Sequence, residues 1–256
     1  MIRGVRPSRD ARLAVPRDPP PALPAAAALS AAGSIRALVF DFDGLILETE
    51  SPAFESWAEI YRDHGFELPR ERWLENIGAS VWPFDALDHL ASLVTAPFDR
   101  VAIKARREAR KSEILATLEA VAGVREYFAD AARLGLRIGV ASSASESYVC
   151  AHLERLALRE GIATVICRDH VARGKPAPDL YLRALADLGV AASEALAFED
   201  SPNGVAAAKA AGLRCVAVPN AITAGLDLSA ADLVLASLGD LPLARLLAQL
   251  GSSPGR

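Results

Sequence analysis

The sequence predicts an α/β fold in which a parallel sheet, flanked by helices, carries an inserted block made of helices alone. Two observations support this prediction. From Ile35 onward, short apolar runs alternate with amphipathic helical stretches, a pattern typical of a parallel sheet. Between Ser51 and Val121 the alternation stops and only helical patterns occur. This interval is therefore expected to form a small second domain, a cap over the edge of the sheet.

Six apolar runs are the candidate strands. They are Ile35–Phe40, Leu136–Ala141, Ala163–Cys167, Ala195–Phe198, Arg214–Val218 and Leu233–Leu235. Helices are expected between the later strands and at the end of the fold. Their approximate ranges are 124–134, 145–157, 178–188, 203–211 and 240–249. A glycine or proline follows or interrupts these patterns, where the chain must turn back to the sheet.

The inserted block begins with apolar residues at positions i, i+3, i+4 and i+7, which predicts a helix. These residues are Phe54, Trp57, Ala58 and Tyr61, and further helices are expected at about 69–77, 83–94 and 98–119. We interpret Trp57, Tyr61 and Trp73 as core residues of the cap. We interpret the basic stretch Arg100, Lys104, Arg106, Arg107, Arg110 and Lys111 as a solvated helix face with Glu108 and Glu113 as its partners.

Three regions follow from these patterns. Residues 1–34 are rich in proline and alanine and contain no aromatic residue, which predicts a disordered tail. Residues 35–52 and 121–249 are expected to form the α/β core. Residues 53–120 are expected to form the helical cap.

Composition excludes several classes of function. There are 28 Lys and Arg residues against 32 Asp and Glu residues, a net charge of −4, so no basic field for nucleic acid is expected. The three cysteines contain no CxxC spacing, which disfavours a disulfide framework or a zinc site and favours the cytoplasm. No apolar run reaches the length of about 18 residues that spans a membrane. A monomer is the default expectation.

Polar residues follow three of the predicted strands at the point where each strand ends. They are Asp41 and Asp43, then Ser142 and Ser143, and finally Glu199, Asp200 and Ser201. Because parallel sheets bind ligands outside the carboxyl ends of their strands, we expect these side chains to lie at one edge.

Four of these residues are carboxylates, namely Asp41, Asp43, Glu199 and Asp200. Like charges at one place raise one another's pKa unless a cation neutralises them, and oxygen ligands favour Mg²⁺. Asp41 and Asp43 are two residues apart, so they project to the same side of an extended chain. That spacing suits one carboxylate as nucleophile and the other as general acid and base.

Lys175 is one of only four lysines and lies between Gly174 and Pro176. A lysine held in such a rigid turn can serve as a point charge for a phosphoryl group and can balance the carboxylates. A surface loop cation is the alternative interpretation.

Four motifs in order resemble those of the haloacid dehalogenase-like superfamily, in the branch of β-phosphoglucomutase-like and phosphoglycolate phosphatase-like hydrolases with a helical cap. The motifs are Asp41-Phe-Asp-Gly-Leu-Ile-Leu-Glu-Thr-Glu50, Val140-Ala-Ser142, Gly174-Lys-Pro-Ala-Pro178 and Phe198-Glu-Asp-Ser-Pro-Asn-Gly204. The resemblance covers about residues 35–240. It implies a Rossmann-like parallel sheet with the cap inserted between the first and second motifs.

The resemblance also implies the roles of the site residues. Asp41 would attack phosphorus and form an aspartyl-phosphate, and Asp43 would protonate the leaving alcohol and then activate water. Ser142, Ser143 and Lys175 would bind the phosphoryl oxygens. Glu199 and Asp200 would hold Mg²⁺ together with Asp41 and the main-chain carbonyl of Asp43. The protein is therefore expected to be a phosphatase for a small phosphorylated metabolite of the sugar phosphate kind.

Two alternatives remain beside a phosphatase. A sugar-phosphate mutase of the β-phosphoglucomutase type resembles the chain, but the histidine expected in the first motif region falls on Ala53. The cap loop Gly78-Ala-Ser-Val-Trp82 also lacks the expected arginine. A non-catalytic binding domain on the same fold is the second alternative, although Asp41 and Asp43 speak against it. Trp82 is expected to face the site, either as a substrate contact or as a packing residue.

Overall fold

A six-stranded sheet forms the core of the protein in the computed structural model, which describes residues 35–77 and 82–251. All five strand pairs are parallel, and the order across the sheet is β3-β2-β1-β4-β5-β6. The strands are β1 (Ala37–Phe40), β2 (Arg137–Ala141), β3 (Thr164–Ile166), β4 (Ala195–Glu199), β5 (Arg214–Ala217) and β6 (Leu233–Val234). The predicted α/β class is confirmed, and each strand lies within a few residues of its predicted range.

The strand order reverses at β1. After β1 the chain builds β2 and β3 on one side, and it then returns to place β4, β5 and β6 on the other side. Phe40, the last residue of β1, pairs with Val140 of β2 and with Phe198 of β4. The residues that follow these strands therefore meet at a reversal of strand order, where open parallel sheets bind their ligands.

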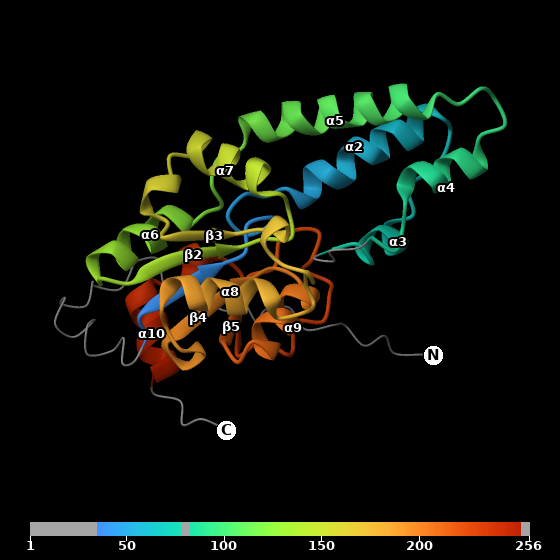
Figure 1. Cartoon of the computed structure of the whole chain (residues 1–256). Helices are drawn as coiled ribbons and strands as arrows, with labels where there is room; N and C mark the ends of the chain where they lie inside the picture. The colour runs from blue at the N-terminus through green and yellow to red at the C-terminus, as the bar shows by residue number, and fades with distance from the viewer. Residues whose placement is uncertain (1–34, 78–81, 252–256) are drawn as a thin grey trace, which may run out of the picture.

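Alternate residues of each strand face opposite layers of helices. Leu38 and Phe40 of β1 belong to the core cluster that includes helices α6, α7 and α10, whereas Ala37 and Val39 belong to the cluster that includes α8 and α9. Figure 1 shows the sheet between these two layers, with α8 and α9 in front of it. The flanking helices are α6 (Val124–Arg133), α7 (Glu146–Arg155), α8 (Asp179–Leu188), α9 (Pro202–Ala210) and α10 (Leu243–Gly251).

Four helices lie in the described part of the interval between β1 and α6 and form the cap. They are α2 (Glu50–Asp63), α3 (Arg70–Leu74), α4 (Ala86–Leu93) and α5 (Arg100–Thr117). In Figure 1, α2 and α5 run side by side away from the sheet, and these two helices contact each other closely. Trp57, Tyr61 and Trp73 are buried in the core of the cap, as predicted. Because α2 begins at Glu50, the domain boundary predicted between residues 52 and 53 falls inside a helix.

The cap rests directly on loops of the core. Ile222, which follows β5 along the chain, is buried in the hydrophobic cluster of the cap. Asn203 donates a hydrogen bond from its side-chain amide to the carbonyl of Ile77 at 2.9 Å, and Arg70 donates to the carbonyl of Ala221 at 3.4 Å. These contacts hold the cap over the carboxyl ends of the strands.

The sequence also predicts a disordered N-terminal tail and no membrane-spanning segment. The tail predicted over residues 1–34 lies outside the described residues. Within residues 35–77 and 82–251, no helix combines the length and the apolar character that crossing a membrane requires.

Candidate active site

The chain turns sharply directly after β1, and this turn brings the first motif to the edge of the sheet. Asp41 donates its backbone N–H to the carbonyl of Phe198 at 2.9 Å, which extends the pairing with β4 by one step. Gly44 has a positive φ of 80°, a conformation that glycine adopts without strain. A Cβ atom at this position would lie 2.1 Å from Oδ2 of Asp200. Glycine therefore permits both the turn and the close approach of Asp200.

Three buried carboxylates meet beside this turn. Asp41, Glu199 and Asp200 each place an oxygen so that the three oxygens lie within 4.8 Å of one another. Burial, with nearby Asp41 as the next cause, raises the pKa of Asp200 well above its ordinary value. Oxygen ligands at this spacing fit a hard divalent cation such as Mg²⁺, which would relieve the repulsion among them. The predicted contribution of Asp43 to this site is its main-chain carbonyl, and that contribution stays a prediction.

Lys175 balances part of this negative charge. Its ammonium nitrogen lies 2.5 Å from Oδ1 of Asp41 and 2.6 Å from Oε1 of Glu199, and the residue is only 3% exposed. Burial alone would lower the pKa of Lys175, but the two carboxylates raise it above its ordinary value. Lys175 is therefore a buried cation of the site rather than the surface loop cation of the alternative interpretation.

Glu199 is also held by a tyrosine that sequence reasoning did not select. The hydroxyl of Tyr181, on α8, donates to Oε1 of Glu199 at 2.5 Å, and the ammonium of Lys175 lies 5.4 Å from the centre of the Tyr181 ring. Burial raises the pKa of Glu199 to about 7 against the opposing effect of Lys175. The carboxyl group of Glu199 therefore has a fixed orientation even without a metal ion.

Asp43 faces the cavity and is oriented by two hydroxyl groups. Thr49 donates to its Oδ1 at 2.9 Å, and Ser142 donates to its Oδ2 at 3.3 Å. Burial raises the pKa of Asp43, although the positive charge of Lys111 and these two hydrogen bonds oppose that effect. A carboxyl group with a raised pKa is suited to give and take protons near neutral pH.

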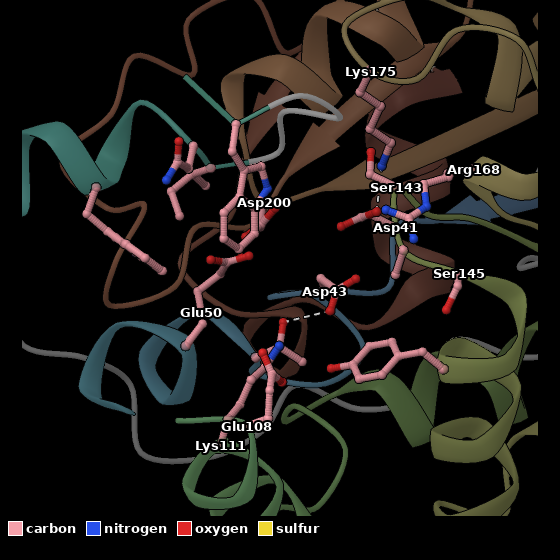
Figure 2. A pocket seen from close by; sticks show the side chains of 18 of the residues that line it. Asp41, Asp43, Glu50, Glu108, Lys111, Ser143, Ser145, Arg168, Lys175 and Asp200 are labelled. Atoms are coloured by element: carbon pink, nitrogen blue, oxygen red, sulfur yellow. Dashed lines mark hydrogen bonds and ion pairs between the residues drawn. The ribbon is translucent and has the colours of Figure 1, made fainter. Parts of the chain in front are cut away.

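The two serines after β2 occupy different positions. Ser142 is fully buried, and its hydroxyl accepts a hydrogen bond from the backbone N–H of Ala144 at 3.0 Å while it donates to Asp43. Ser143 lines the cavity itself, and Figure 2 shows it close to Asp41. The sequence assigned both residues to phosphate binding, and the structure brings both to the site.

A cavity of about 430 Å³ lies between the strand ends and the cap. Its lining residues come from the first motif, from the cap helices α2, α3 and α5 and the segment between α3 and α4, from α7, and from core loops after β2, β3 and β4. They are Asp41, Asp43, Thr49, Glu50, Ala53, Trp73, Asn76, Ile77, Trp82, Arg107, Glu108, Lys111, Ser143, Ala144, Ser145, Tyr148, Arg168, Lys175 and Asp200. The volume suits a small metabolite.

Trp82 lines this cavity, as the sequence predicts, and it remains 55% exposed. Its ring meets the ring of Trp73 edge to face, with 5.8 Å between the ring centres. The rest of the predicted cap loop, residues 78–81, lies outside the described residues. Trp82 therefore combines packing against the cap with a position at the site.

The interpretation of α5 as a uniformly solvated basic face is wrong for two of its residues. Arg107 is only 4% exposed and lies over the Trp57 ring, 5.6 Å from its centre. Lys111 lines the cavity together with Arg107. Residues 107, 111 and 115 share one helix face, and the buried Leu115 is apolar, so this spacing is the signal that could have placed them inward. The other four basic residues of the stretch, Arg100, Lys104, Arg106 and Arg110, are exposed as expected.

Two further residues of the cavity received no role from the sequence. Glu50 begins α2, and burial together with the charge of Asp43 raises the pKa of its carboxyl group to about 8. Tyr148 lies on α7, and the ammonium of Lys111 sits 5.4 Å from the centre of its ring. In Figure 2, Glu50, Glu108 and Lys111 face the cavity from the cap helices, across Asp43 from Asp41 and Lys175.

Known proteins match this chain over most of its length. Residues 38–218 match the family described as haloacid dehalogenase-like hydrolase. The chain is 39% identical over 218 residues to the protein named "Putative phosphatase YhcW" of Bacillus subtilis, which covers 85% of this chain and 99% of the relative. It is 31% identical over 183 residues to the fructose-1-phosphate phosphatase YqaB of Escherichia coli, which covers 71% of this chain and 95% of the relative.

Solved structures share the fold. The crystal structure of CbbY from Rhodobacter sphaeroides in complex with phosphate has a TM-score of 0.61 and 30% sequence identity. The match covers 80% of this chain and 96% of that chain. It therefore extends over the sheet, the flanking helices and the cap rather than over the core alone.

Proposed function

The chain belongs to the haloacid dehalogenase-like hydrolases and is a phosphoric monoester hydrolase of that family, and we propose that it hydrolyses a small phosphorylated metabolite of the sugar phosphate kind. The proposed route passes through an aspartyl-phosphate on Asp41 and uses Mg²⁺. Relatives with the names of phosphatases, one of them a fructose-1-phosphate phosphatase, support the class of substrate.

One observation carries this proposal. Asp41 stands at the reversal of strand order with its carboxylate bonded to Lys175, and the oxygens of Glu199 and Asp200 lie within 4.8 Å. Catalysis of phosphoryl transfer is mainly positioning and the neutralisation of charge on oxygen. A carboxylate nucleophile beside a buried cation and a divalent metal site supplies both.

In the first step, a carboxylate oxygen of Asp41 forms a bond to phosphorus as the bond from phosphorus to the alcohol oxygen breaks. The alcohol oxygen takes a proton from the carboxyl group of Asp43, and burial raises the pKa of this group above its ordinary value. In the second step, Asp43 accepts a proton from water as the water oxygen attacks phosphorus. Inorganic phosphate leaves, and the carboxylate of Asp41 is regenerated.

Other residues of the site hold the phosphoryl group and the cofactor. Ser142, Ser143 and Lys175 are assigned to the phosphoryl oxygens, with Lys175 as the positive charge nearest to Asp41. Glu199 and Asp200 would hold Mg²⁺ with Asp41 and the main-chain carbonyl of Asp43. When bound, Mg²⁺ supplies positive charge that neutralises the phosphoryl oxygens in the transition state.

Hydrolysis is favoured over a mutase reaction by one position in the cavity. Ala53 lines the cavity at the place where the resemblance to sugar-phosphate mutases calls for a histidine. An alanine side chain cannot accept a proton from a sugar hydroxyl. A mutase reaction, in which the phosphoryl group returns to a second hydroxyl of the sugar, therefore has no proton acceptor at this position.

The proposal is tested by a Mg²⁺-dependent assay with p-nitrophenyl phosphate. We expect p-nitrophenol release with Mg²⁺ and none with excess EDTA, and we expect Asp41→Asn to remove the activity while its melting temperature stays close to that of the native chain. Absence of turnover with p-nitrophenyl phosphate and with a panel of small phosphate esters would instead support a non-catalytic binding domain.

A further inference from the structure

The acids of the proposed metal site are held by two kinds of donor. Asp41 and Glu199 share the ammonium group of Lys175, at 2.5 Å and 2.6 Å. The carboxylate of Asp200 accepts a hydrogen bond from a neutral group, because the side-chain amide of Asn220 donates to its Oδ2 at 2.7 Å. Asn220 lies in the loop that follows β5. Neither the sequence motifs nor the proposed chemistry assigns this residue a part in the site.

The orientation of the Asn220 amide is fixed from its other end. Its Oδ1 accepts the backbone N–H groups of Ile222 at 2.9 Å and of Thr223 at 3.0 Å. An atom that accepts two N–H groups is the amide oxygen and not the amide nitrogen, since the NH₂ group can only donate. The NH₂ group of Asn220 therefore points away from its own turn and toward Asp200.

This NH₂ group connects the two segments that carry the acids. It donates to Oδ2 of Asp200 and also lies 3.3 Å from the main-chain carbonyl oxygen of Gly44, to which it donates a second bond. A Cβ atom on Gly44 would lie only 2.6 Å from the amide nitrogen of Asn220, so these groups are packed closely together. The amide therefore joins the residue after β4 to the turn after β1.

The loop that carries Asn220 has a fixed base. The backbone N–H of Asn220 donates to Oγ1 of Thr223 at 2.9 Å, and Thr223 is fully buried. Ile222, between them, is buried in the hydrophobic cluster of the cap. The residue that bonds Asp200 thus belongs to the loop on which the cap rests.

A neutral donor suits an acid that binds a cation. A carboxylate held in one orientation before the metal arrives loses less freedom on binding than a mobile one. A lysine or arginine at position 220 could hold the carboxylate as well, but its charge would repel Mg²⁺. An amide avoids that repulsion, and its hydrogen bond favours the ionised form of Asp200, which is the form that ligates a metal.

On the basis of the proposed function, we propose that Asn220 is a positioning residue of the metal site, whose amide fixes the orientation of the Asp200 carboxylate and thereby raises the affinity for Mg²⁺. Asn220 contacts neither the phosphoryl group nor the alcohol in this assignment. In the opposing assignment Asn220 serves only its own loop, as the acceptor that closes a turn.

Two variants separate these roles. Asn220→Ser keeps a side-chain oxygen that can close the turn but has no NH₂ group to reach Asp200. Thr223→Val removes the other side-chain bond of the same loop and leaves the amide of Asn220 in place. Isothermal titration with Mg²⁺ in the absence of substrate measures the affinity of each protein. We expect the Kd to rise roughly ten- to a hundredfold in Asn220→Ser and to stay within about threefold of the native value in Thr223→Val.

The phosphatase assay gives a second measurement. In Asn220→Ser, the concentration of Mg²⁺ that gives half of the maximal rate should rise by the same factor as the Kd. The KM for p-nitrophenyl phosphate at saturating Mg²⁺ should stay close to the native value, because the substrate does not meet Asn220. A general loosening of the site would raise both quantities.

The inference is overturned if Asn220→Ser binds Mg²⁺ as tightly as the native protein, or if Thr223→Val weakens binding as much as Asn220→Ser does. In both cases the native protein still binds Mg²⁺ and hydrolyses the ester, so the proposed function survives. A native protein that neither binds Mg²⁺ nor releases p-nitrophenol removes the proposed function together with the inference.

Discussion

Lys175 decides the charge balance of the site at the scale of single residues. It is bonded to two buried carboxylates, and no other lysine among the described residues is as deeply buried. Removing one partner of a buried ion pair leaves the other charge without compensation. The same residue that the resemblance assigns to phosphate binding therefore also keeps the carboxylates of Asp41 and Glu199 together.

Replacing Lys175 should therefore cost stability as well as activity. We expect Lys175→Met to lower the free energy of unfolding by about 3 kcal/mol in EDTA, and Mg²⁺ to restore part of the loss by supplying another cation to the same carboxylates. Urea denaturation with and without Mg²⁺ measures both effects. Lys209→Met is the control, because Lys209 pairs with Asp232 at the surface and should cost less than about 1 kcal/mol. A native-like stability of Lys175→Met in EDTA would contradict this account.

Glu199 makes stability depend on pH in a direction that its raised pKa fixes. The pKa of its carboxyl group is about 7 in the folded protein, above its ordinary value, so the folded state favours the protonated form. The stability that this preference contributes is complete at low pH and is lost as the pH rises through about 7. In EDTA the free energy of unfolding should therefore fall between pH 5.5 and pH 8 by about 2 kcal/mol from this group.

Glu199→Gln isolates that contribution, because glutamine keeps the shape of the side chain and does not titrate. The other buried groups remain in both proteins, and Glu199 contributes to the raised pKa of Asp200, so the difference between the two stability profiles reports Glu199 together with its coupling to Asp200. We expect the variant to show the smaller fall. Parallel profiles for the two proteins across this pH range would exclude a raised pKa at Glu199.

At the scale of elements, the turn after β1 depends on Gly44 for two separate reasons. Gly44 has a positive φ of 80°, and a Cβ atom there would overlap the carboxylate of Asp200. Gly65 has a similar φ of 83°, yet a Cβ atom there would meet nothing within 4 Å. Alanine variants at Gly44 and Gly65 therefore separate the effect of backbone strain from the effect of displacing Asp200.

Gly65→Ala should cost only the strain of a left-handed backbone, about 1 kcal/mol, with unchanged phosphatase activity. Gly44→Ala should cost more than this and should also weaken Mg²⁺ binding, because Asp200 must move. Thermal denaturation and isothermal titration with Mg²⁺ distinguish the two effects. Equal behaviour of the two variants in both measurements would mean that the contact between Gly44 and Asp200 has no consequence.

The elements themselves were largely predictable, and the exceptions have a physical cause. Strands and core helices carry local patterns of apolar residues, so β1 and α8 could be placed from a few consecutive residues. The inward face of α5 has a weaker local signal, the spacing of Arg107, Lys111 and Leu115, because its burial depends on how the cap docks on the core. That docking involves Ile222, which lies more than a hundred residues later in the chain and enters the cap core.

At the scale of the whole molecule, the site is a product of the topology. The acids and the cation of the site come from three strand ends, and the order of the strands brings these ends together. Asp41 and Asp43 follow β1, Lys175 follows β3, and Glu199 and Asp200 lie at the end of β4. The sequence was sufficient to name Asp41, Asp43, Lys175 and Asp200, because each directly follows an apolar run or belongs to a recognisable motif. Bonds that join separate segments, such as that of Tyr181 to Glu199, required the structure.

The cavity likewise has one part that the sequence predicted and one part that required the structure. Its floor at the strand ends was predictable from the motifs, whereas the inward position of Arg107 and Lys111 in its cap wall was recognised from the packing of helices. The proposed chemistry thus lies at the edge of the sheet, and the cap covers it.

The central claim is that Asp41 carries the phosphoryl group during turnover, and it can be tested directly. The protein is mixed with Mg²⁺ and excess phosphate ester, quenched in acid within the first turnovers, digested and analysed by mass spectrometry. We expect a phosphoryl group on Asp41 in the native protein and none on that peptide in Asp41→Asn. Rapid hydrolysis of the ester by a protein whose phosphoryl group is found on another residue would contradict the account.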